Sequence, residues 1–266
     1  MLKDAVEDYS THPILSVGPE SGLADILNVM DKHRVRRVMV RGVEGFVTID
    51  YIVDIVYKME SFLVNSVSFD SIRSSSLRTI KPPLVNGGSP IIDVAKIMHK
   101  ASIDFVVVDS REFLGIFTVR GLLRAIEVGE LPKPALHYST KLYPAVDIEA
   151  RLYDAIKAMR TYNVRSVLVT EAGRTIRGVI PSKEIIHALA EYGMHAINEE
   201  IHDVVNPVEA FASPEYSIDR VAKIMLDKDT EVTVINVGRE VVGVVDEWGV
   251  IQAAAGVDSR GFKLEE

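Results

Sequence analysis

The sequence predicts an α+β protein in which one β-α-β-β-α unit is repeated four times, and two recurring patterns support this prediction. The first is an apolar quartet with i, i+3, i+4, i+7 spacing, which lines one face of a helix. It begins with Leu23, Ile26 and Leu27 and always ends in methionine, at Met30, Met98, Met159 and Met225. The second is a β-branched run followed by glycine and two apolar residues, with glycines 63 to 70 residues apart at Gly45, Gly115, Gly178 and Gly243. A fixed period of this kind indicates an internal repeat.

Copy 1 contains each expected element in turn. Residues 13–17 predict a first strand, which the turn-forming residues 18–22 close. The apolar quartet then predicts a helix, and Asp25 in its first turn suits the positive end of the helix dipole. Residues 38–40 and 46–48 predict a hairpin, and residues 51–56 predict a second helix.

The other copies repeat this order. Copy 2 has an expected first strand at 84–85, a hairpin at 105–108 and 114–117, and a closing helix at 122–126. The hairpins of copies 3 and 4 are expected at 167–169 with 176–180 and at 232–235 with 241–245.

A copy of about 50–60 residues is too small to bury both faces of its strands and helices, so we expect the copies to pair. Residues 128–137 carry two prolines and predict the main linker. The expected organisation is therefore two pseudo-twofold pairs. The first, residues 1–130, joins repeats at 9–59 and 76–127; the second, residues 131–266, joins repeats at 138–190 and 203–256.

Composition excludes several functional classes. A net charge of −8 argues against a dedicated nucleic-acid binder, whose surface is usually basic. The absence of cysteine excludes disulfides and thiolate metal sites. No apolar run approaches the length of a membrane span, and the N-terminus does not look like a signal peptide, so we expect a cytoplasmic protein without a membrane partner. The histidines lack metal-site spacing, and no phosphate loop or nucleophile with a placed base is present. We therefore expect no enzyme activity, no metal and no required cofactor.

The quartet ending in methionine, the V-x-V strand and the Gly-apolar-apolar-Thr turn, complete at 45–48 and 115–118, resemble tandem CBS (cystathionine-β-synthase) domains. The resemblance covers almost the whole chain, with four repeats as in the γ subunits of AMP-activated protein kinase. It implies a ligand sensor that binds AMP, ADP, ATP or S-adenosylmethionine in clefts between paired repeats. It also implies an unidentified regulated protein as partner, and association of the chain as a homodimer.

In that family, a Thr or Ser after the glycine turn and an Asp three positions later contact the ribose. The corresponding pairs here are Thr48 with Tyr51, Thr118 with Gly121, Pro181 with Glu184, and Asp246 with Gly249. No copy has both partners, so the resemblance leaves Thr48, Thr118 and Glu184 as the ribose-binding candidates. The structural alternative for the two threonines is a helix N-cap, and the two roles are compatible.

The family's phosphate-facing position lies six residues after the methionine, and it holds Arg36, Asp104, Arg165 and Glu231 in copies 1 to 4. An arginine attracts a phosphate and an acid repels it, so we expect one phosphate site in each pair, at Arg36 and at Arg165. Arg120 and Lys183, two residues after the turn position, are further phosphate candidates. The alternative is that these cations are exposed at helix ends.

Three functions therefore remain open. The first is a nucleotide sensor with clefts near Arg36/Thr48 and Arg165/Glu184. The second is a ligand-free dimerisation or interaction scaffold, which the incomplete ribose pairs favour. The third is a nucleic-acid-binding regulator that uses the basic stretch 32–41, which the acidic net charge disfavours. We also expect Trp248 to fill the cleft of copy 4, and Met98 and Met159 to be buried.

Overall fold

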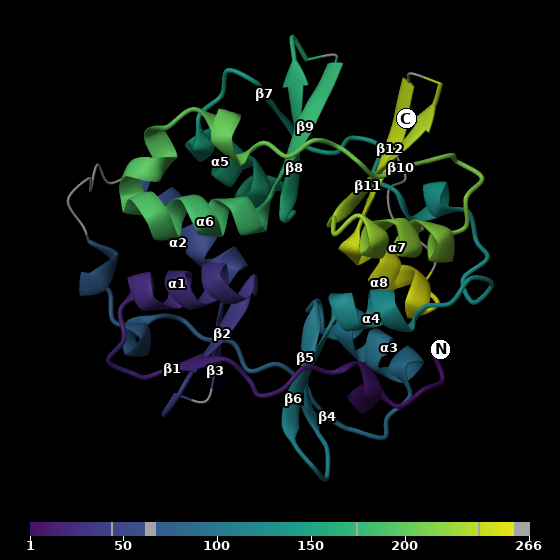
Figure 1. The fold of residues 1–266 in the computed structure, drawn as a ribbon, viewed down its shortest axis with the longest axis horizontal. Helices are drawn as coiled ribbons and strands as arrows, with labels where there is room; N and C mark the ends of the chain where they lie inside the picture. Colours follow the sequence, from purple (N-terminus) through teal and green to yellow (C-terminus); the bar gives the residue numbers. More distant parts are fainter. Residues whose placement is uncertain (44, 62–67, 174, 239, 258–266) are drawn as a thin grey trace. The chain divides into compact units, whose positions relative to one another are not determined.

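The computed structural model describes residues 1–43, 45–61, 68–173, 175–238 and 240–257, so residues 258–266 of the second predicted pair lie outside the described residues. The described chain contains four three-stranded sheets, one in each copy (Figure 1). In every sheet the first strand is parallel to the second, and the second is antiparallel to the third. One helix joins the parallel strands and another follows the third strand. This arrangement confirms the predicted α+β repeat.

The elements of copy 1 are β1 (Ser16–Val17), α1 (Leu23–His33), β2 (Arg37–Val40), β3 (Gly45–Thr48) and α2 (Ile49–Ser61). Those of copy 2 are β4 (Leu84–Asn86), α3 (Ile91–Ala101), β5 (Phe105–Asp109), β6 (Leu114–Thr118) and α4 (Val119–Ala125). Those of copy 3 are β7 (Ala145–Asp147), α5 (Leu152–Tyr162), β8 (Ser166–Glu171), β9 (Thr175–Pro181) and α6 (Ser182–Tyr192). Those of copy 4 are β10 (Phe211–Ala212), α7 (Ile218–Asp227), β11 (Val232–Val237), β12 (Glu240–Asp246) and α8 (Glu247–Ala254).

Short 3₁₀ helices lie before copy 1 and between the copies. They are η1 (Val6–Tyr9), η2 (Phe69–Ser71), η3 (Ser74–Ser76), η4 (Ala135–Tyr138), η5 (Gly193–Asn198) and η6 (Ile201–Val204).

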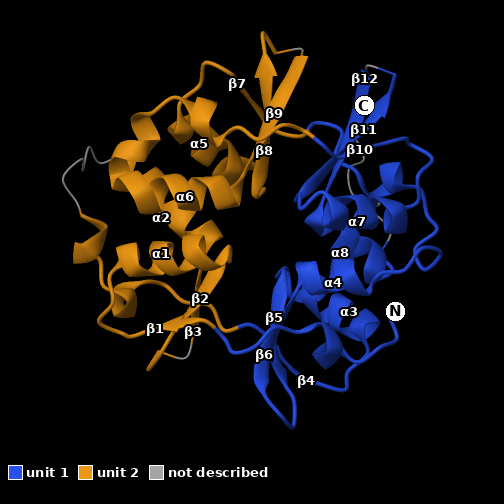
Figure 2. Cartoon of the chain, viewed as in Figure 1, with its two compact units in different colours: residues 1–14, 82–142, 209–266 blue, residues 15–81, 143–208 orange. Residues whose placement is uncertain are grey.

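The chain forms two compact units, each built from alternate copies (Figure 2). Unit 1 comprises residues 1–14, 82–142 and 209–266 and holds copies 2 and 4; unit 2 comprises residues 15–81 and 143–208 and holds copies 1 and 3. In unit 2, α1 packs against α6 and α2 against α5; in unit 1, α3 packs against α8 and α4 against α7. The compact units therefore do not follow the division expected near residue 130, because the apolar helix faces of alternate copies cover each other.

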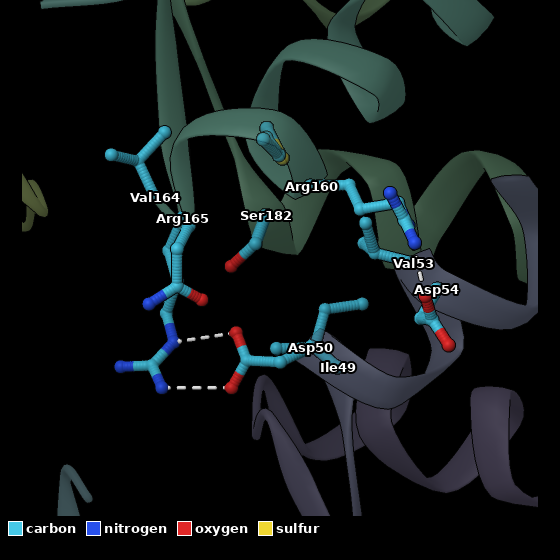
Figure 3. A pocket seen from close by; sticks show the side chains of 10 residues that line it. Ile49, Asp50, Val53, Asp54, Arg160, Val164, Arg165 and Ser182 are labelled. Atoms are coloured by element: carbon cyan, nitrogen blue, oxygen red, sulfur yellow. Dashed lines mark hydrogen bonds and ion pairs between the residues drawn. The ribbon is translucent and has the colours of Figure 1, made fainter. Parts of the chain in front are cut away.

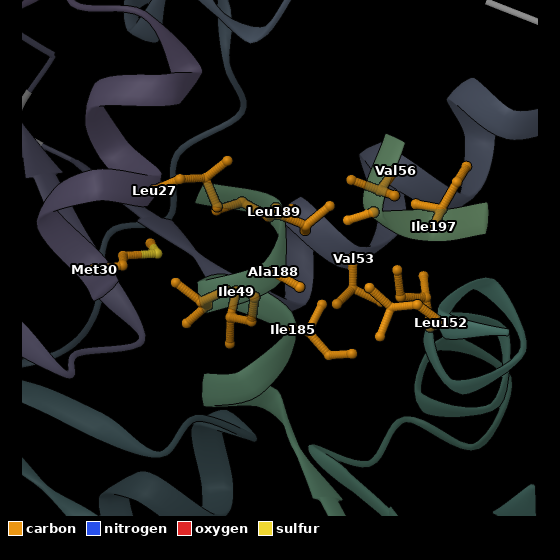
Figure 4. Close-up of a cluster of buried hydrophobic side chains, with 14 of the residues drawn as sticks. Leu27, Met30, Ile49, Val53, Val56, Leu152, Ile185, Ala188, Leu189 and Ile197 are labelled. Carbon is orange, nitrogen blue, oxygen red and sulfur yellow. The ribbon is translucent and has the colours of Figure 1, made fainter. Parts of the chain in front are cut away.

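The recurring quartets form the core of both units. Met30, Met98 and Met225 are fully buried and Met159 is 2% exposed, which confirms the expected burial of Met98 and Met159. Each unit has its own apolar cluster, and Figure 4 shows that of unit 2, to which α1, α2, α5 and α6 all contribute side chains. Burial of these faces supplies the main driving force for helix pairing.

A segment from outside each sheet explains the recurring glycine. A Cβ on Gly178 would lie 2.6 Å from the carbonyl oxygen of Asn206, and one on Gly115 would lie 3.0 Å from that of Thr11. Gly45 and Gly243 are approached instead by the side chains of Thr79 and Ser139. Backbone bridges hold these segments, as Phe46 with Ile80, Thr11 with Ile116, Val179 with Asn206 and Thr140 with Val244. The glycine therefore marks the place where a covering segment contacts the third strand.

The predicted linker at 128–137 is anchored within unit 1. The backbone N–H groups of Gly129 and Leu131 donate to the Asp219 carboxylate, at 2.8 and 3.1 Å. The Ala135 N–H donates to the Tyr216 carbonyl at 2.7 Å. The segment between copies 2 and 3 is thus held by the start of α7 in copy 4.

Candidate functional site

The predicted phosphate position has the same backbone setting in successive copies. Each first helix is followed by a residue in the left-handed conformation, two positions before the phosphate position: Arg34, Ser102, Asn163 and Asp229. The carbonyl groups of Arg36, Asp104 and Arg165 then accept hydrogen bonds from the first residue of the second helix, at 2.9, 3.1 and 2.7 Å. The structure therefore brings Arg36 beside the turn that contains Thr48, and Arg165 beside the start of α6.

Unit 2 contains a cavity of about 300 Å³ between α2, the end of α5 and the start of α6 (Figure 3). Its charged lining consists of Asp50, Asp54, Arg160 and Arg165. The other lining residues are Ile49, Val53, Met159, Asn163, Val164 and Ser182. This volume lies at the lower end of the range for small-molecule sites.

Arg165 makes a bidentate ion pair with Asp50 across this cavity. Its Nε and Nη2 atoms donate to the two carboxylate oxygens at 3.0 and 2.8 Å. The Arg165 side chain is 26% exposed, so the alternative of a fully solvated surface arginine does not describe it. The sequence predicts Arg165 as a phosphate candidate. It does not predict the partner, Asp50, which lies 115 residues away in another copy.

A second ion pair also lines the cavity. Arg160 donates from Nε to Asp54 at 2.9 Å, and its guanidinium carbon lies 4.4 Å from the centre of the Tyr57 ring. The hydrogen bond from Lys58 is the main cause that lowers the pKa of Asp54, and Arg160 lowers it further despite partial burial. Asp54 is therefore held ionised by two cations.

Ser182 supplies an unusual polar group at the start of α6. The residue is 1% exposed, and its hydroxyl oxygen is buried without a hydrogen-bond partner in the described structure. Figure 3 shows this hydroxyl directed toward the Arg165–Asp50 pair. A buried hydroxyl without a partner costs free energy, so it is a marked feature of the cavity.

The contacts between copies 1 and 3 in unit 2 have an approximate twofold symmetry, and a second contact supports this symmetry. His187 and Asp31 occupy the repeat positions of Asp54 and Arg160, and they too are in contact, with His187 Nδ1 3.2 Å from an Asp31 oxygen. By the same symmetry, Lys183 corresponds to Asp50, and Arg36 corresponds to Arg165. At the two repeat positions where one half of unit 2 has Arg165 and Asp50, the other half has two cations, Arg36 and Lys183.

In unit 1, the repeat position of Asp50 holds Arg120 in copy 2 and Trp248 in copy 4, and each contacts a side chain of the other copy. Arg120 forms an ion pair with Asp229 at 2.9 Å. Trp248 stacks on His99 of copy 2, with ring centroids 5.6 Å apart. The expectation that Trp248 fills the cleft of copy 4 stays a prediction. Asp104, at the phosphate position of copy 2, is 3% exposed.

The ribose candidates have separate environments. Thr48 is buried at the end of β3, where it pairs with Arg37 on β2. Glu184 accepts a hydrogen bond from the Asn206 amide at 3.3 Å and is not among the lining residues of the cavity. The capping alternative is wrong for Thr118, whose side chain makes no cap hydrogen bond. Asp246 does cap α8, by accepting the Gly249 N–H at 3.1 Å.

The described residues contain neither a cluster of metal ligands nor a helix that could span a membrane. No group of three or more His, Asp or Glu side chains in the described ranges is placed to hold a metal ion. No helix of the described chain is long and apolar enough to cross a membrane.

Similar folds occur in solved structures. A crystal structure from Methanocaldococcus jannaschii, described as a candidate archaeal homologue of γ-AMPK, has a TM-score of 0.78 at 17% identity and covers 93% of this chain and 99% of that chain. An uncharacterized conserved protein from Pyrococcus horikoshii has a TM-score of 0.62 at 15% identity and covers 94% of this chain and 99% of its own. At such identities the likeness shows the fold alone.

The sequence is similar to one curated protein and matches one family model. An uncharacterized 17.7 kDa protein of Acidianus ambivalens is 24% identical over 149 residues, which cover 53% of this chain and 91% of the relative. The model of the CBS domain family matches residues 6–58, 75–128 and 135–191, which span copies 1, 2 and 3, and copy 4 has the same order of strands and helices. The chain therefore belongs to the CBS domain family, as its resemblance in sequence predicts.

Proposed function

We propose that the protein is a non-catalytic regulatory sensor that binds an adenine nucleotide (AMP, ADP or ATP) through unit 2. One observation carries the phosphate side of this proposal: the two strand-preceding arginines, Arg36 and Arg165, belong to the same compact unit. Lys183 and Arg160 add two further cations to that unit. Arginine suits phosphate oxygens because its planar guanidinium donates two parallel hydrogen bonds.

The two halves of unit 2 favour Arg36 as the first phosphate contact. Arg165 is bound to Asp50, whereas the repeat position that corresponds to Asp50 holds a cation, Lys183, in copy 3. An anion near Arg36 and Lys183 gains from both positive charges, while one near Arg165 competes with a carboxylate. Thr48, which lies beside Arg36 at the end of β3, is the corresponding ribose candidate.

The adenosine part of the proposal rests on membership of the CBS domain family. S-adenosylmethionine is the alternative ligand, and its chemistry separates it from the nucleotides. It carries a sulfonium cation and no phosphate, so Arg36 and Lys183 would not favour it.

Unit 1 fits the scaffold alternative better. Its Arg120 is in an ion pair with Asp229, and Trp248 lies on His99, so side chains of the protein already contact each other at these positions. Acids at the phosphate positions, Asp104 and Glu231, also oppose an anionic ligand. We therefore assign unit 1 a structural role and unit 2 the ligand. Self-association and an unidentified regulated protein in the cytoplasm complete the proposal.

Calorimetric titration of the full chain with AMP, ADP, ATP and S-adenosylmethionine tests the proposal. We expect nucleotide binding that weakens at least tenfold in Arg36→Ala, a loss of about 1.4 kcal/mol. Arg120→Ala, a matched change in unit 1, is expected to leave the affinity within twofold. Absence of binding at millimolar nucleotide, or equal effects of the two substitutions, would contradict it.

A further inference from the structure

We propose that Asp50 is an internal competitor for a phosphate group: the cavity of unit 2 accepts a phosphoryl anion between Arg165 and Ser182 when the Asp50 carboxylate leaves. This inference deepens the proposed function, on which it rests for the identity of the natural ligand. It assigns a role to an acidic residue that matches no position of the family's ribose pattern.

The geometry of the Arg165–Asp50 pair supports the exchange. Both carboxylate oxygens accept from the guanidinium, at 3.0 and 2.8 Å, and a phosphate group uses the same parallel pair of donors. The Asp50 side chain is 46% exposed whereas that of Arg165 is 26% exposed. The carboxylate can therefore turn into water at a small cost, and the arginine stays at the cavity wall.

Ser182 supplies an independent observation at the same place. Its hydroxyl is buried and unpartnered, lines the cavity, and lies at the start of α6, a helix of 11 residues. A hydroxyl hydrogen that has no acceptor in the protein can be donated to an oxygen of a bound anion. The positive end of the α6 dipole adds to the attraction.

Charge balance explains why Asp50 and not Asp54 is the competitor. Asp54 is bound by both Arg160 and Lys58, so its release would break two ion pairs. Release of Asp50 breaks one, with Arg165. The four charged lining residues carry no net charge together, and removal of the Asp50 charge leaves the cavity positive.

The exchange also sets a minimum strength of binding that a ligand must reach at this site. A ligand displaces Asp50 only if it binds the Arg165 guanidinium more strongly than the carboxylate does. Phosphate groups with a higher negative charge therefore compete better than a single weakly charged group. Because Asp50 lies in the first turn of α2, its release breaks the link between α2 and Arg165, which lies between α5 and β8. Occupancy of the cavity is thereby coupled to the packing of copies 1 and 3.

Pyrophosphate binding to the full-length protein tests this inference without depending on the nucleobase. The variants are Asp50→Asn, Ser182→Ala, Arg165→Ala and the double variant Asp50→Asn/Arg165→Ala. Asp93→Asn is the charge-matched control, because Asp93 forms an exposed ion pair with Lys96 in unit 1. Affinity is measured by calorimetry at low and at physiological salt, after circular dichroism has confirmed the fold of each variant.

We expect Asp50→Asn to bind pyrophosphate at least fivefold more tightly than the unaltered protein, with Asp93→Asn within twofold of it. The gain should disappear in the double variant Asp50→Asn/Arg165→Ala and shrink in a second double variant, Asp50→Asn/Ser182→Ala, which is added for this comparison. Equal affinity of Asp50→Asn and the unaltered protein, an equal gain in Asp93→Asn, or no measurable binding in any variant would overturn the inference. Pyrophosphate binding with these dependences but no nucleotide binding would remove the proposed function and leave the anion exchange standing.

Discussion

Asp219 accepts a hydrogen bond from the backbone N–H of Leu131 at 3.1 Å, so a buried carboxylate on α7 holds the segment that precedes copy 3. The N–H groups of Gly129 and Arg220 and the Ser217 hydroxyl also donate to it. Burial opposes ionisation of Asp219, but these hydrogen bonds outweigh it and lower its pKa. The carboxylate is therefore ionised at neutral pH and stabilises the folded state.

Asp219→Asn is expected to lower the free energy of unfolding by about 1 to 3 kcal/mol at pH 7, because an amide cannot accept all of these donors. Since the folded-state pKa lies below the unfolded one, the contribution is complete above about pH 4 and is lost as the pH falls further. Urea unfolding between pH 7 and pH 3 measures it. Asp93→Asn, an exposed first-turn aspartate in unit 1, is the control. If the unfolding free energies of Asp219→Asn and the unaltered protein differ by the same amount from pH 7 to pH 3, the role assigned to Asp219 is refuted.

Gly178→Ala tests the covering segment of copy 3. The added Cβ would lie 2.6 Å from the Asn206 carbonyl oxygen, and the backbone must shift to accommodate it. We expect a loss of about 2 to 4 kcal/mol in the free energy of unfolding. In the control Gly18→Ala, the nearest atom would lie 3.9 Å away, so the stability should change by no more than about 0.5 kcal/mol. Similar effects of the two substitutions would show that close approach does not explain the recurring glycine.

Thr233→Val is expected to stabilise the protein. The Thr233 hydroxyl is fully buried on β11 without a hydrogen-bond partner among the described residues, and valine has nearly the same shape. Removal of the unsatisfied group should raise the free energy of unfolding by about 1 kcal/mol. Thr170→Val is the matched comparison, because the Thr170 hydroxyl donates to the Val146 carbonyl at 3.3 Å and its loss should destabilise. Thermal unfolding of both variants shows whether each substitution raises or lowers the stability. A destabilised Thr233→Val protein would contradict the prediction.

Met98→Asp and Met159→Asp are expected to abolish soluble expression. Both methionines end an apolar quartet in the core of their unit, and an unpaired charge there is not tolerated. Ile97→Asp is the control, because Ile97 lies beside Met98 in sequence but is 37% exposed. Soluble, stable protein from either methionine variant would discredit the assignment of the repeats.

The fold of each copy could be predicted because its signals are local. The quartet ending at Met30 fixes which face of α1 is apolar, and the glycine at Gly45 fixes where β3 begins. The choice of partner could not be predicted, because periodicity shows which helix face is buried but not which copy covers it. The contacts of α1 with α6 and of α2 with α5 join segments at least 91 residues apart in the chain (152 − 61 for α2 and α5).

The sequence predicted only part of the candidate site, because it does not show which copies come into contact. The fixed distance from the methionine found Arg36 and Arg165, whereas the partner of Arg165 was missed because Asp50 lies one position from the expected ribose carboxylate. A usable signal was present: at the repeat position where copy 1 has Asp50, copy 3 has Lys183, although both copies keep the arginine. Ser182 was missed because its hydroxyl lies one position after Pro181, where the family pattern expects a Thr or Ser.

A crystal structure of the full chain grown with ATP tests the central claim most directly. The account predicts phosphate groups in contact with the guanidinium of Arg36 or Arg165 in unit 2. It also predicts that no phosphate lies at the acidic positions, Asp104 and Glu231, of unit 1. ATP with its phosphates bound at unit 1, or crystals in which neither arginine contacts phosphate at saturating ATP, would contradict the account.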